Sequence, residues 1–307
     1  MSNQELELNI TAASYRASWR DYLELCKPRV VALMLLCATV GMFLATESMI
    51  SLDLLLFTNL GIALVAGSAA SVNHIIDAQI DINMARTAQR PIAQGRVSRS
   101  SGIVFSAVIG VAGMSILVLF VNPLTAWLNL GSWIGYGIIY SAYLKRATPQ
   151  NIVIGGLFGA APPLFGWTAV TNQIDAGGLL LVMIIFTWTP PHFWALALDR
   201  KEEYAKVGIP MLPVTHGELI TKYYILGYTF LLVGVTVIPF VIGMSGVVYL
   251  ATALVLGTGF IGWSIRLFMG HKGAAIKTFR YSIFYLMMLF LGLLADHAYL
   301  VISSAAV

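Results

Sequence analysis

The chain has 307 residues, of which 58% are hydrophobic and only 10% are charged. A soluble domain averages about 25% charged residues, so this chain cannot hide its apolar side chains in one aqueous core, and lipid must solvate most of it. The formal net charge of +4 could suggest nucleic acid, but that class is excluded if the basic residues orient membrane helices instead. Cys26 and Cys37 are too few for a disulfide scaffold or a structural zinc site.

The chain opens with a polar segment, residues 1–27, which we expect on the cytoplasmic side. This segment contains Glu5 and Glu7 and lacks an early apolar run. It therefore resembles neither a cleavable signal peptide nor an acid-poor mitochondrial transit peptide. The expected location is a bacterial cell (inner) membrane.

Nine apolar stretches follow, each long enough to cross a bilayer, for which roughly 20 residues are needed. They lie near 30–46, 54–76, 102–121, 124–143, 151–170, 177–198, 222–243, 247–265 and 281–302. The sequence therefore predicts an all-α polytopic membrane protein, with a single membrane-embedded domain over 1–307.

Lysines and arginines alternate with these spans. All 18 lie before or at the start of the first span, or after the second, fourth, sixth and eighth. By the positive-inside rule the N-terminus is cytoplasmic and the C-terminus outside. The basic excess is thus an orientation signal, and we expect lipid rather than nucleic acid around the chain.

Glycine spacing and loop lengths indicate where helices pack closely and where long connections lie. The glycine pairs Gly131/Gly135 and Gly155/Gly159 have the spacing that lets membrane helices approach closely. Two long cytoplasmic loops, 77–101 and 199–221, follow the second and sixth spans.

Polar residues gather at the cytoplasmic ends of these same two spans. The stretch "NHIIDAQID" places Asn73, Asp77 and Asp81 four residues apart, so on a helix they share one face. The stretch "DRKEEY" places Asp199 and Glu203 at the same spacing after the sixth span. Like charges at this spacing repel, so each cluster needs cations.

Both clusters are expected on helix that continues past the apolar core. After the sixth span, Gly208 stops a helix that reaches about Lys206, while Pro190 and Pro191 kink it or break and restart it. After the second span, the stop falls at Pro91 and Gly95, residues that end a helix in the same manner.

The residues around the carboxylates indicate what they bind. Mg²⁺ is usually held by one or two carboxylates together with substrate phosphates. Arg86, Arg90, Arg200 and Lys201 stand beside the acids and suit a diphosphate. A site at the membrane surface that combines carboxylates, a metal ion and basic side chains fits a lipid diphosphate. The head of such a lipid lies at the interface and its tail lies among the helices. The alternative is a solvated rim of charged residues.

Three stretches resemble a known family. "NHIIDAQIDINMARTAQRP" (73–91) resembles the first aspartate-rich motif of the UbiA-type intramembrane prenyltransferase superfamily, and "CKPRVV" (26–31) resembles the start of its first helix. "WTPPHFWALALDRKEEYAKVGIPMLPV" (188–214) resembles the second motif region of the haem-farnesylating branch. The similarity in spacing and helix count covers essentially the whole chain. One departure is Glu203, where the superfamily commonly has Asp.

The resemblance implies nine helices around a central cavity, with Mg²⁺ and farnesyl diphosphate at its cytoplasmic mouth. It implies transfer of the farnesyl group to a vinyl group of haem B, with water addition, giving haem O and diphosphate. The implied catalytic residues are Asn73, Asp77, Asp81, Asp199 and Glu203, of which the four acids are the implied metal ligands. Haem A synthase or terminal oxidase assembly is the implied downstream partner.

His192 is the one candidate for haem itself. It lies about two turns, roughly 10 Å, before Asp199 on the same face, and a histidine inside a membrane is a functional candidate by default. Two roles are equally open for His192. One is iron ligation or haem positioning, and the other is a structural hydrogen bond near the proline pair. Asp296 and His297, at the outer end of the ninth span, are expected to face water.

Other functions remain open at this point. A secondary transporter predicts ionisable groups near the bilayer midplane, and only the Pro190–Pro191 pair favours it. A non-catalytic haem carrier explains His192 but gives no reason for the acids. A prenyltransferase acting on a quinone-type aromatic acceptor is the nearest alternative, and the 188–214 stretch argues against it.

Overall fold

The computed structural model describes residues 17–305, and within that range it contains helices and no strand. The first part of the predicted polar segment 1–27 therefore lies outside the described residues. Seven helices are long and apolar enough to cross a membrane, or eight if α2 and α3, bent by 54° at their junction, form one span. The all-α membrane architecture is confirmed, while the count of nine spans and the orientation stay predictions.

The helices follow the predicted spans closely. Their bounds are α2 (Trp19–Leu25), α3 (Pro28–Leu44), α4 (Leu52–Asp81), α5 (Arg99–Phe120), α6 (Pro123–Trp133), the π-helix η1 (Ile134–Leu144), α7 (Lys145–Ala147), α8 (Asn151–Gly159), α9 (Pro162–Thr171), α10 (Ala176–Asp199), α11 (Lys201–Lys206), α12 (Leu212–Thr215), α13 (Gly217–Val241), α14 (Val247–Phe268) and α15 (Ala274–Ala305). The predicted span 124–143 is divided between α6 and η1, so neither part alone reaches the length of a span.

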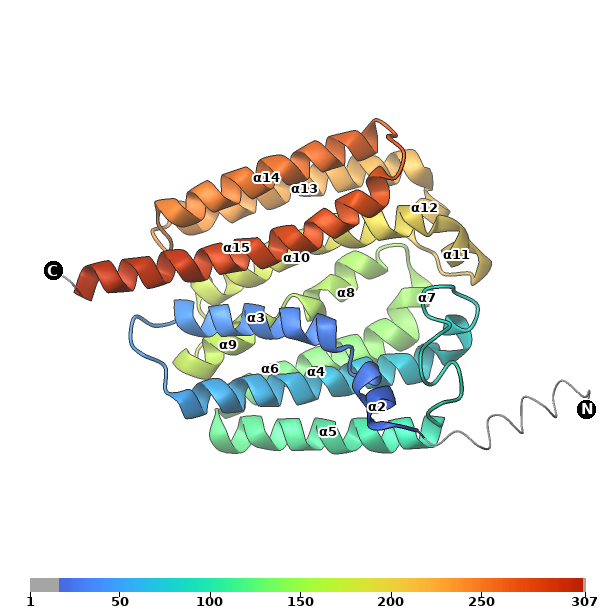
Figure 1. The fold of residues 1–307 in the computed structure, drawn as a ribbon, viewed down its shortest axis with the longest axis horizontal. Helices are drawn as coiled ribbons and strands as arrows, with labels where there is room; N and C mark the ends of the chain where they lie inside the picture. The colour runs from blue at the N-terminus through green and yellow to red at the C-terminus, as the bar shows by residue number, and fades with distance from the viewer. Residues whose placement is uncertain (1–16, 306–307) are drawn as a thin grey trace, which may run out of the picture.

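Six helices form a closed ring. The helices α4, α3, α15, α10, α8 and η1 each pack against the next, and η1 packs against α4. Outside this ring, α5 covers α4, and α13 and α14 lie beyond α10 and α15 (Figure 1). The ring therefore places α4 and α10, the helices that carry the two acidic motifs, on different sides of one bundle.

Both motif-bearing helices end at the same end of the bundle. The segment 82–98, α7, α11 and α12 gather there with α2, whereas the α3–α4 connection and the C-terminus lie at the opposite end (Figure 1). We call the end that carries α7, α11 and α12 the basic end, because the predicted cytoplasmic segments lie there.

Glycine sets the closest helix approach, between α3 and α9. A Cβ at Gly41 would overlap the backbone of Pro163, and one at Gly166 would overlap the carbonyl of Ala38. The two backbones are thus in direct contact, as small residues permit in membranes.

In each of the two predicted glycine pairs, one glycine lies against a neighbouring helix and the other does not. Gly135 and Gly155 lie directly against aromatic rings of Phe158 and Tyr140, but a Cβ at Gly131 or Gly159 would meet nothing. Spacing alone therefore does not show which face of a helix another helix covers.

The helix α10 runs through Pro190 and Pro191 without a break, so of the two predicted effects of this pair the break is excluded and the kink stays a prediction. Membrane helices tolerate proline where neighbours and local adjustment satisfy the freed carbonyls. Two other predictions, about a helix end and about exposure, are wrong. The helix α4 ends at Asp81, well before Pro91. Asp296 is buried and accepts hydrogen bonds from the backbone N–H groups of Gly246 and Tyr249, so it caps the start of α14 and does not face water.

Candidate active site

The first motif lies on the buried face of α4 and is compensated by two lysines from other elements. The Asn73 amide donates to Asp77 Oδ2 at 2.9 Å and to Ser141 Oγ at 3.0 Å. Lys27 Nζ donates to Asn73 Oδ1 at 2.7 Å, and Lys145 Nζ pairs with Asp77 Oδ2 at 2.6 Å. These contacts explain why a chain so poor in charge can place an amide and carboxylates on one buried face.

Asp81, the third member of the motif, is 2% exposed and pairs with Arg90 at 2.7 Å. Its carbonyl accepts hydrogen bonds from the Thr87 hydroxyl and the Met84 N–H. These bonds turn the chain back on itself and end α4 there. The segment 82–98 thereby returns toward the end of α4 and brings Arg90 onto Asp81.

Lys27 is the centre of the cationic side of the site. It lies at the break between α2 and α3, with a left-handed backbone (φ 51°). The pKa of Lys27 is lowered to about 7, first by burial and then by the cations of Arg90, Lys145 and Arg86, while the carboxylate of Asp77 opposes these effects. Four cations and one carboxylate therefore act on the same small volume.

The π-helix η1 supplies the neutral wall of this site. Tyr136 accepts a hydrogen bond from Lys27 at 3.2 Å and stacks on Tyr140 with the ring centroids 5.7 Å apart. Ser141 Oγ donates to the Tyr136 carbonyl, five residues earlier, as well as binding Asn73. Helices of this type occur often at functional sites.

Residue spacing in the sequence does not indicate a role for four residues of this site, Lys27, Lys145, Tyr136 and Ser141. The lysines were interpreted as orientation signals, and the only available hint was the "CKPRVV" stretch that contains Lys27. No spacing in the chain indicates that these residues meet α4.

The second cluster is arranged differently from the prediction. Asp199 is the last residue of α10, Arg200 breaks the helix, and Glu203 lies in α11, so the two acids are not four apart on one helix. Arg200 bridges them, at 3.2 Å from Asp199 Oδ2 and 2.8 Å from Glu203 Oε1. Lys201 pairs instead with exposed Glu218 at 3.2 Å.

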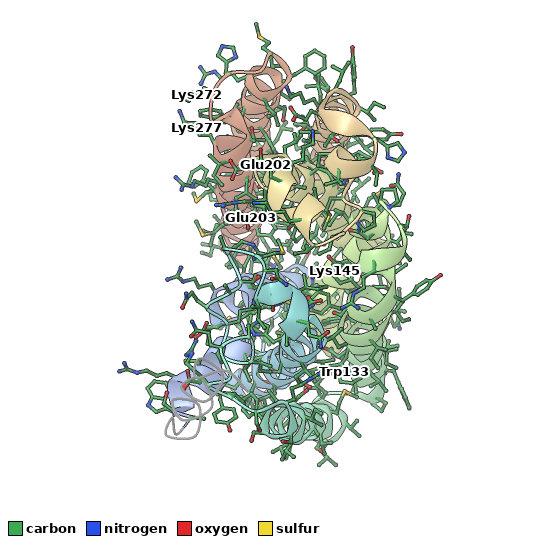
Figure 2. The ribbon with its side chains drawn as sticks, turned by 90° about the vertical axis from the view of Figure 1, so that its right-hand side faces the viewer. Trp133, Lys145, Glu202, Glu203, Lys272 and Lys277 are labelled. Carbon is green, nitrogen blue, oxygen red and sulfur yellow. The ribbon has the colours of Figure 1, made fainter. Side chains whose placement is uncertain are left out.

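Apolar neighbours of the two motifs belong to one hydrophobic cluster. Ile80 and Met84, on either side of Asp81, pack in the same hydrophobic cluster as Ala197 and Tyr204, which flank the second motif. Figure 2 looks onto the basic end and shows Glu203 in α11 and Lys145 at the start of α7. Within residues 17–305, no three His, Cys, Asp or Glu side chains are close enough to hold a metal ion together.

Two carboxylate oxygens nevertheless fit a cation. Asp77 Oδ1 and Glu203 Oε2 are buried and have no hydrogen-bond partner. A buried acceptor left unpaired is costly, so each oxygen is available to a hard cation of the kind that carboxylates bind. These two oxygens fit a hard cation chemically, and their assignment to a metal and diphosphate site stays a prediction.

His192 lies deeper in α10, with 7% of its surface exposed. Its Nδ1 lies 2.6 Å from Ser282 Oγ of α15. The ring stacks on Trp188, with centroids 4.1 Å apart. Both interpretations of this residue, haem positioning and structural hydrogen bond, remain compatible with these contacts.

The fold defines the class of protein. A solved structure from work on digeranylgeranylglyceryl phosphate synthase matches with a TM-score of 0.74 at 19% identity, covering 91% of this chain and 98% of that one. A UbiA homologue from Archaeoglobus fulgidus bound to GPP and Mg²⁺ matches with a TM-score of 0.65 at 16% identity, covering 89% and 99%. These likenesses show a common membrane fold.

The sequence profile of the UbiA prenyltransferase family matches residues 34–295, and the chain belongs to this family. It is 61% identical over 283 residues to a protoheme IX farnesyltransferase of Stutzerimonas stutzeri, covering 92% of this chain and 95% of that protein. It is 58% identical to the corresponding protein of Hahella chejuensis, covering 94% and 97%. The resemblance drawn from the two motifs is confirmed.

Proposed function

We propose that this protein transfers the farnesyl group of farnesyl diphosphate to a vinyl group of haem B, with addition of water, to give haem O and diphosphate. The observation that carries the proposal is the cationic cluster around Lys27 packed against the acids of α4. Relatives about 60% identical that are named protoheme IX farnesyltransferase support the choice of acceptor.

Mg²⁺ fits the residues present. Asp77, Asp81, Asp199 and Glu203 would hold it, since two of them keep an unpaired buried oxygen. When bound, the metal supplies positive charge to the diphosphate that leaves. The A. fulgidus homologue bound to GPP and Mg²⁺ supports a divalent ion in this family.

The cations of the chain itself have two tasks in this proposal. Before substrate binds, Lys145 and Arg90 neutralise Asp77 and Asp81. When the diphosphate enters, the same cations, with Lys27 and the predicted ligand Arg86, stabilise the negative charge that grows as the allylic C–O bond breaks. Arg200 serves the second acid pair in the same way.

Water must be kept from the farnesyl cation until the haem vinyl group attacks it. The stacked rings of Tyr136 and Tyr140 lie beside Lys27, which binds Asn73, and can stabilise positive charge through their faces. The buried aromatic surroundings of His192 form a second apolar region about two turns deeper, where a flat acceptor would lie.

The deciding experiment incubates the purified protein with Mg²⁺, haem B and farnesyl diphosphate. We expect a haem that is heavier by a farnesyl group and a hydroxyl group, because its vinyl group becomes a hydroxyethylfarnesyl group, together with free diphosphate. We expect neither product when Mg²⁺ is chelated. A quinone-pathway aromatic acid serves as the competing acceptor. Prenylation of that acid with no change in haem would overturn the proposed acceptor, and no diphosphate release with either acceptor would overturn the enzyme class.

A further inference from the structure

The imidazole of His192 is held so that only its edge is free. Trp188 stacks on it with centroids 4.1 Å apart and planes 20° apart, and Phe279 of α15 stacks at 4.6 Å and 29°. Two rings cannot occupy one face at these distances, so they cover both. Phe193 adds an edge-on contact at 4.8 Å. A third ring system cannot stack here, but a ligand can reach the ring edge.

Ser282 determines which nitrogen carries the proton. Its Oγ lies 2.6 Å from the carbonyl oxygen of Phe279 and 2.6 Å from His192 Nδ1. A carbonyl oxygen only accepts, so the single hydroxyl proton is donated to it, and Oγ must accept from Nδ1–H. A second proton on the ring would leave an uncompensated charge inside the membrane. The neutral ring therefore has its free lone pair on Nε2.

Ser282 is itself fixed from two sides. It is fully buried, and its carbonyl accepts a hydrogen bond from Trp188 Nε1 at 2.8 Å. The same α10 turn thus binds Ser282 through both Trp188 and His192. In contrast, Nε2 makes no hydrogen bond to any described residue and retains some accessible surface.

We propose that Ser282 is a positioning residue that keeps the proton on His192 Nδ1 and presents Nε2 as a ligand to the iron of the haem acceptor. This inference rests on the proposed function, because it requires haem as the substrate. Metal-binding histidines nearly always donate their other ring N–H to a neighbouring acceptor, which fixes both tautomer and orientation. The two stacked rings also prevent the His192 imidazole from rotating. They leave free the ring edge with Nε2, which would coordinate the iron.

The test titrates haem B into the purified protein and records its absorption spectrum and the iron–histidine stretching band. His192→Ala should lose the ligand signature, and added imidazole should restore it. Ser282→Ala should keep the ligand but weaken haem affinity by roughly 10–100-fold and shift the stretching band. Ser282→Thr, which retains the hydroxyl, should recover most of the affinity.

The matched control is Ser264→Ala in α14. Ser264 is equally buried, and its hydroxyl is hydrogen-bonded to Thr229 at 2.9 Å, but it is not in contact with His192. We expect wild-type haem affinity and spectrum in this variant. An equal loss of haem affinity in Ser264→Ala and Ser282→Ala would mean that any buried serine has this effect through packing. That result would overturn the positioning role of Ser282.

Failure of this inference can be separated from failure of the proposed function. If His192→Ala keeps the wild-type spectrum, or Ser282→Ala the wild-type affinity and stretching band, the inference is wrong, even when the wild-type protein farnesylates haem. If the wild-type protein binds haem through His192 but forms no product, the proposed reaction is wrong and the assignment of the ligand stands.

Discussion

The two carboxylate oxygens of Asp77 differ, because one is hydrogen-bonded and the other is free to bind a further ligand. One of its oxygens accepts from both Lys145 and Asn73, and the other is buried without a partner. A carboxylate desolvated in this way is stable only because Lys145 compensates it. The residue is therefore poised to exchange a lysine contact for a metal contact.

At this scale we predict that Asp77→Asn and Asp199→Asn each lower haem farnesylation by at least about 100-fold, because each removes a negative charge that the metal and diphosphate require. The protein should still insert into membranes, since the amides retain most of the hydrogen bonds. Asp53→Asn is the control, as Asp53 is exposed at the opposite end of α4. Full activity in both site variants would contradict the metal assignment.

Lys27 makes stability depend on pH. Its pKa is lowered from 10.5 to about 7, mainly by burial. Between these values Lys27 holds a proton in the unfolded chain that it has lost in the folded protein. Its contribution to the free energy of unfolding therefore rises with pH through this window and is constant outside it. In Lys27→Met this contribution should vanish. Thermal unfolding in detergent from about pH 6.5 to 9.5 compares the two slopes, and identical slopes would show that Lys27 is not buried in the folded state.

At the scale of elements, the pair α3 and α9 depends on two glycines. Gly41→Ala or Gly166→Ala should lower the free energy of unfolding by about 1–3 kcal/mol, because the added methyl group overlaps backbone atoms that cannot move aside. Gly234→Ala in α13 meets nothing and should be neutral or stabilising by up to ~1 kcal/mol. The measurement is the thermal midpoint in detergent. A loss in Gly234→Ala as large as that in Gly41→Ala would contradict the close-packing argument.

The elements themselves were largely readable from sequence, but their ends were not. Hydropathy located α4 and α10, since a run of apolar residues is a local property. The stop of α4 at Asp81 depends on Arg90 and Thr87 folding back onto it. The break at Arg200 is accompanied by its bridge between two acids. Neither contact leaves a signal in residue spacing.

At the scale of the whole molecule, the ring of six helices brings the two acidic motifs to one end. This end also carries the basic segments, including the α14–α15 connection at the upper right of Figure 1. The positive-inside rule predicts that this end is cytoplasmic. A diphosphate substrate supplied from the cytoplasm would then reach the site without crossing the membrane.

The orientation can be measured with single cysteines in a chain whose Cys26 and Cys37 are replaced. Ser48→Cys, in the exposed α3–α4 connection, should react in intact bacterial cells with a thiol reagent that does not cross the inner membrane. Lys272→Cys, exposed at the basic end, should react only after the cells are opened. The reverse labelling pattern would contradict a cytoplasmic N-terminus.

The sequence by itself determined that lipid is the solvent, where the helices lie, and which helix ends carry acids and bases. Each of these follows from composition or from neighbours along the chain, which hydropathy and helical spacing report directly. Only the tertiary structure decided which groups meet: Lys27 with Asn73 across 46 positions, Lys145 with Asp77 across 68, and Ser282 with His192 across 90. Those pairings depend on the order in which helices pack around the ring, and local spacing contains no information about that order.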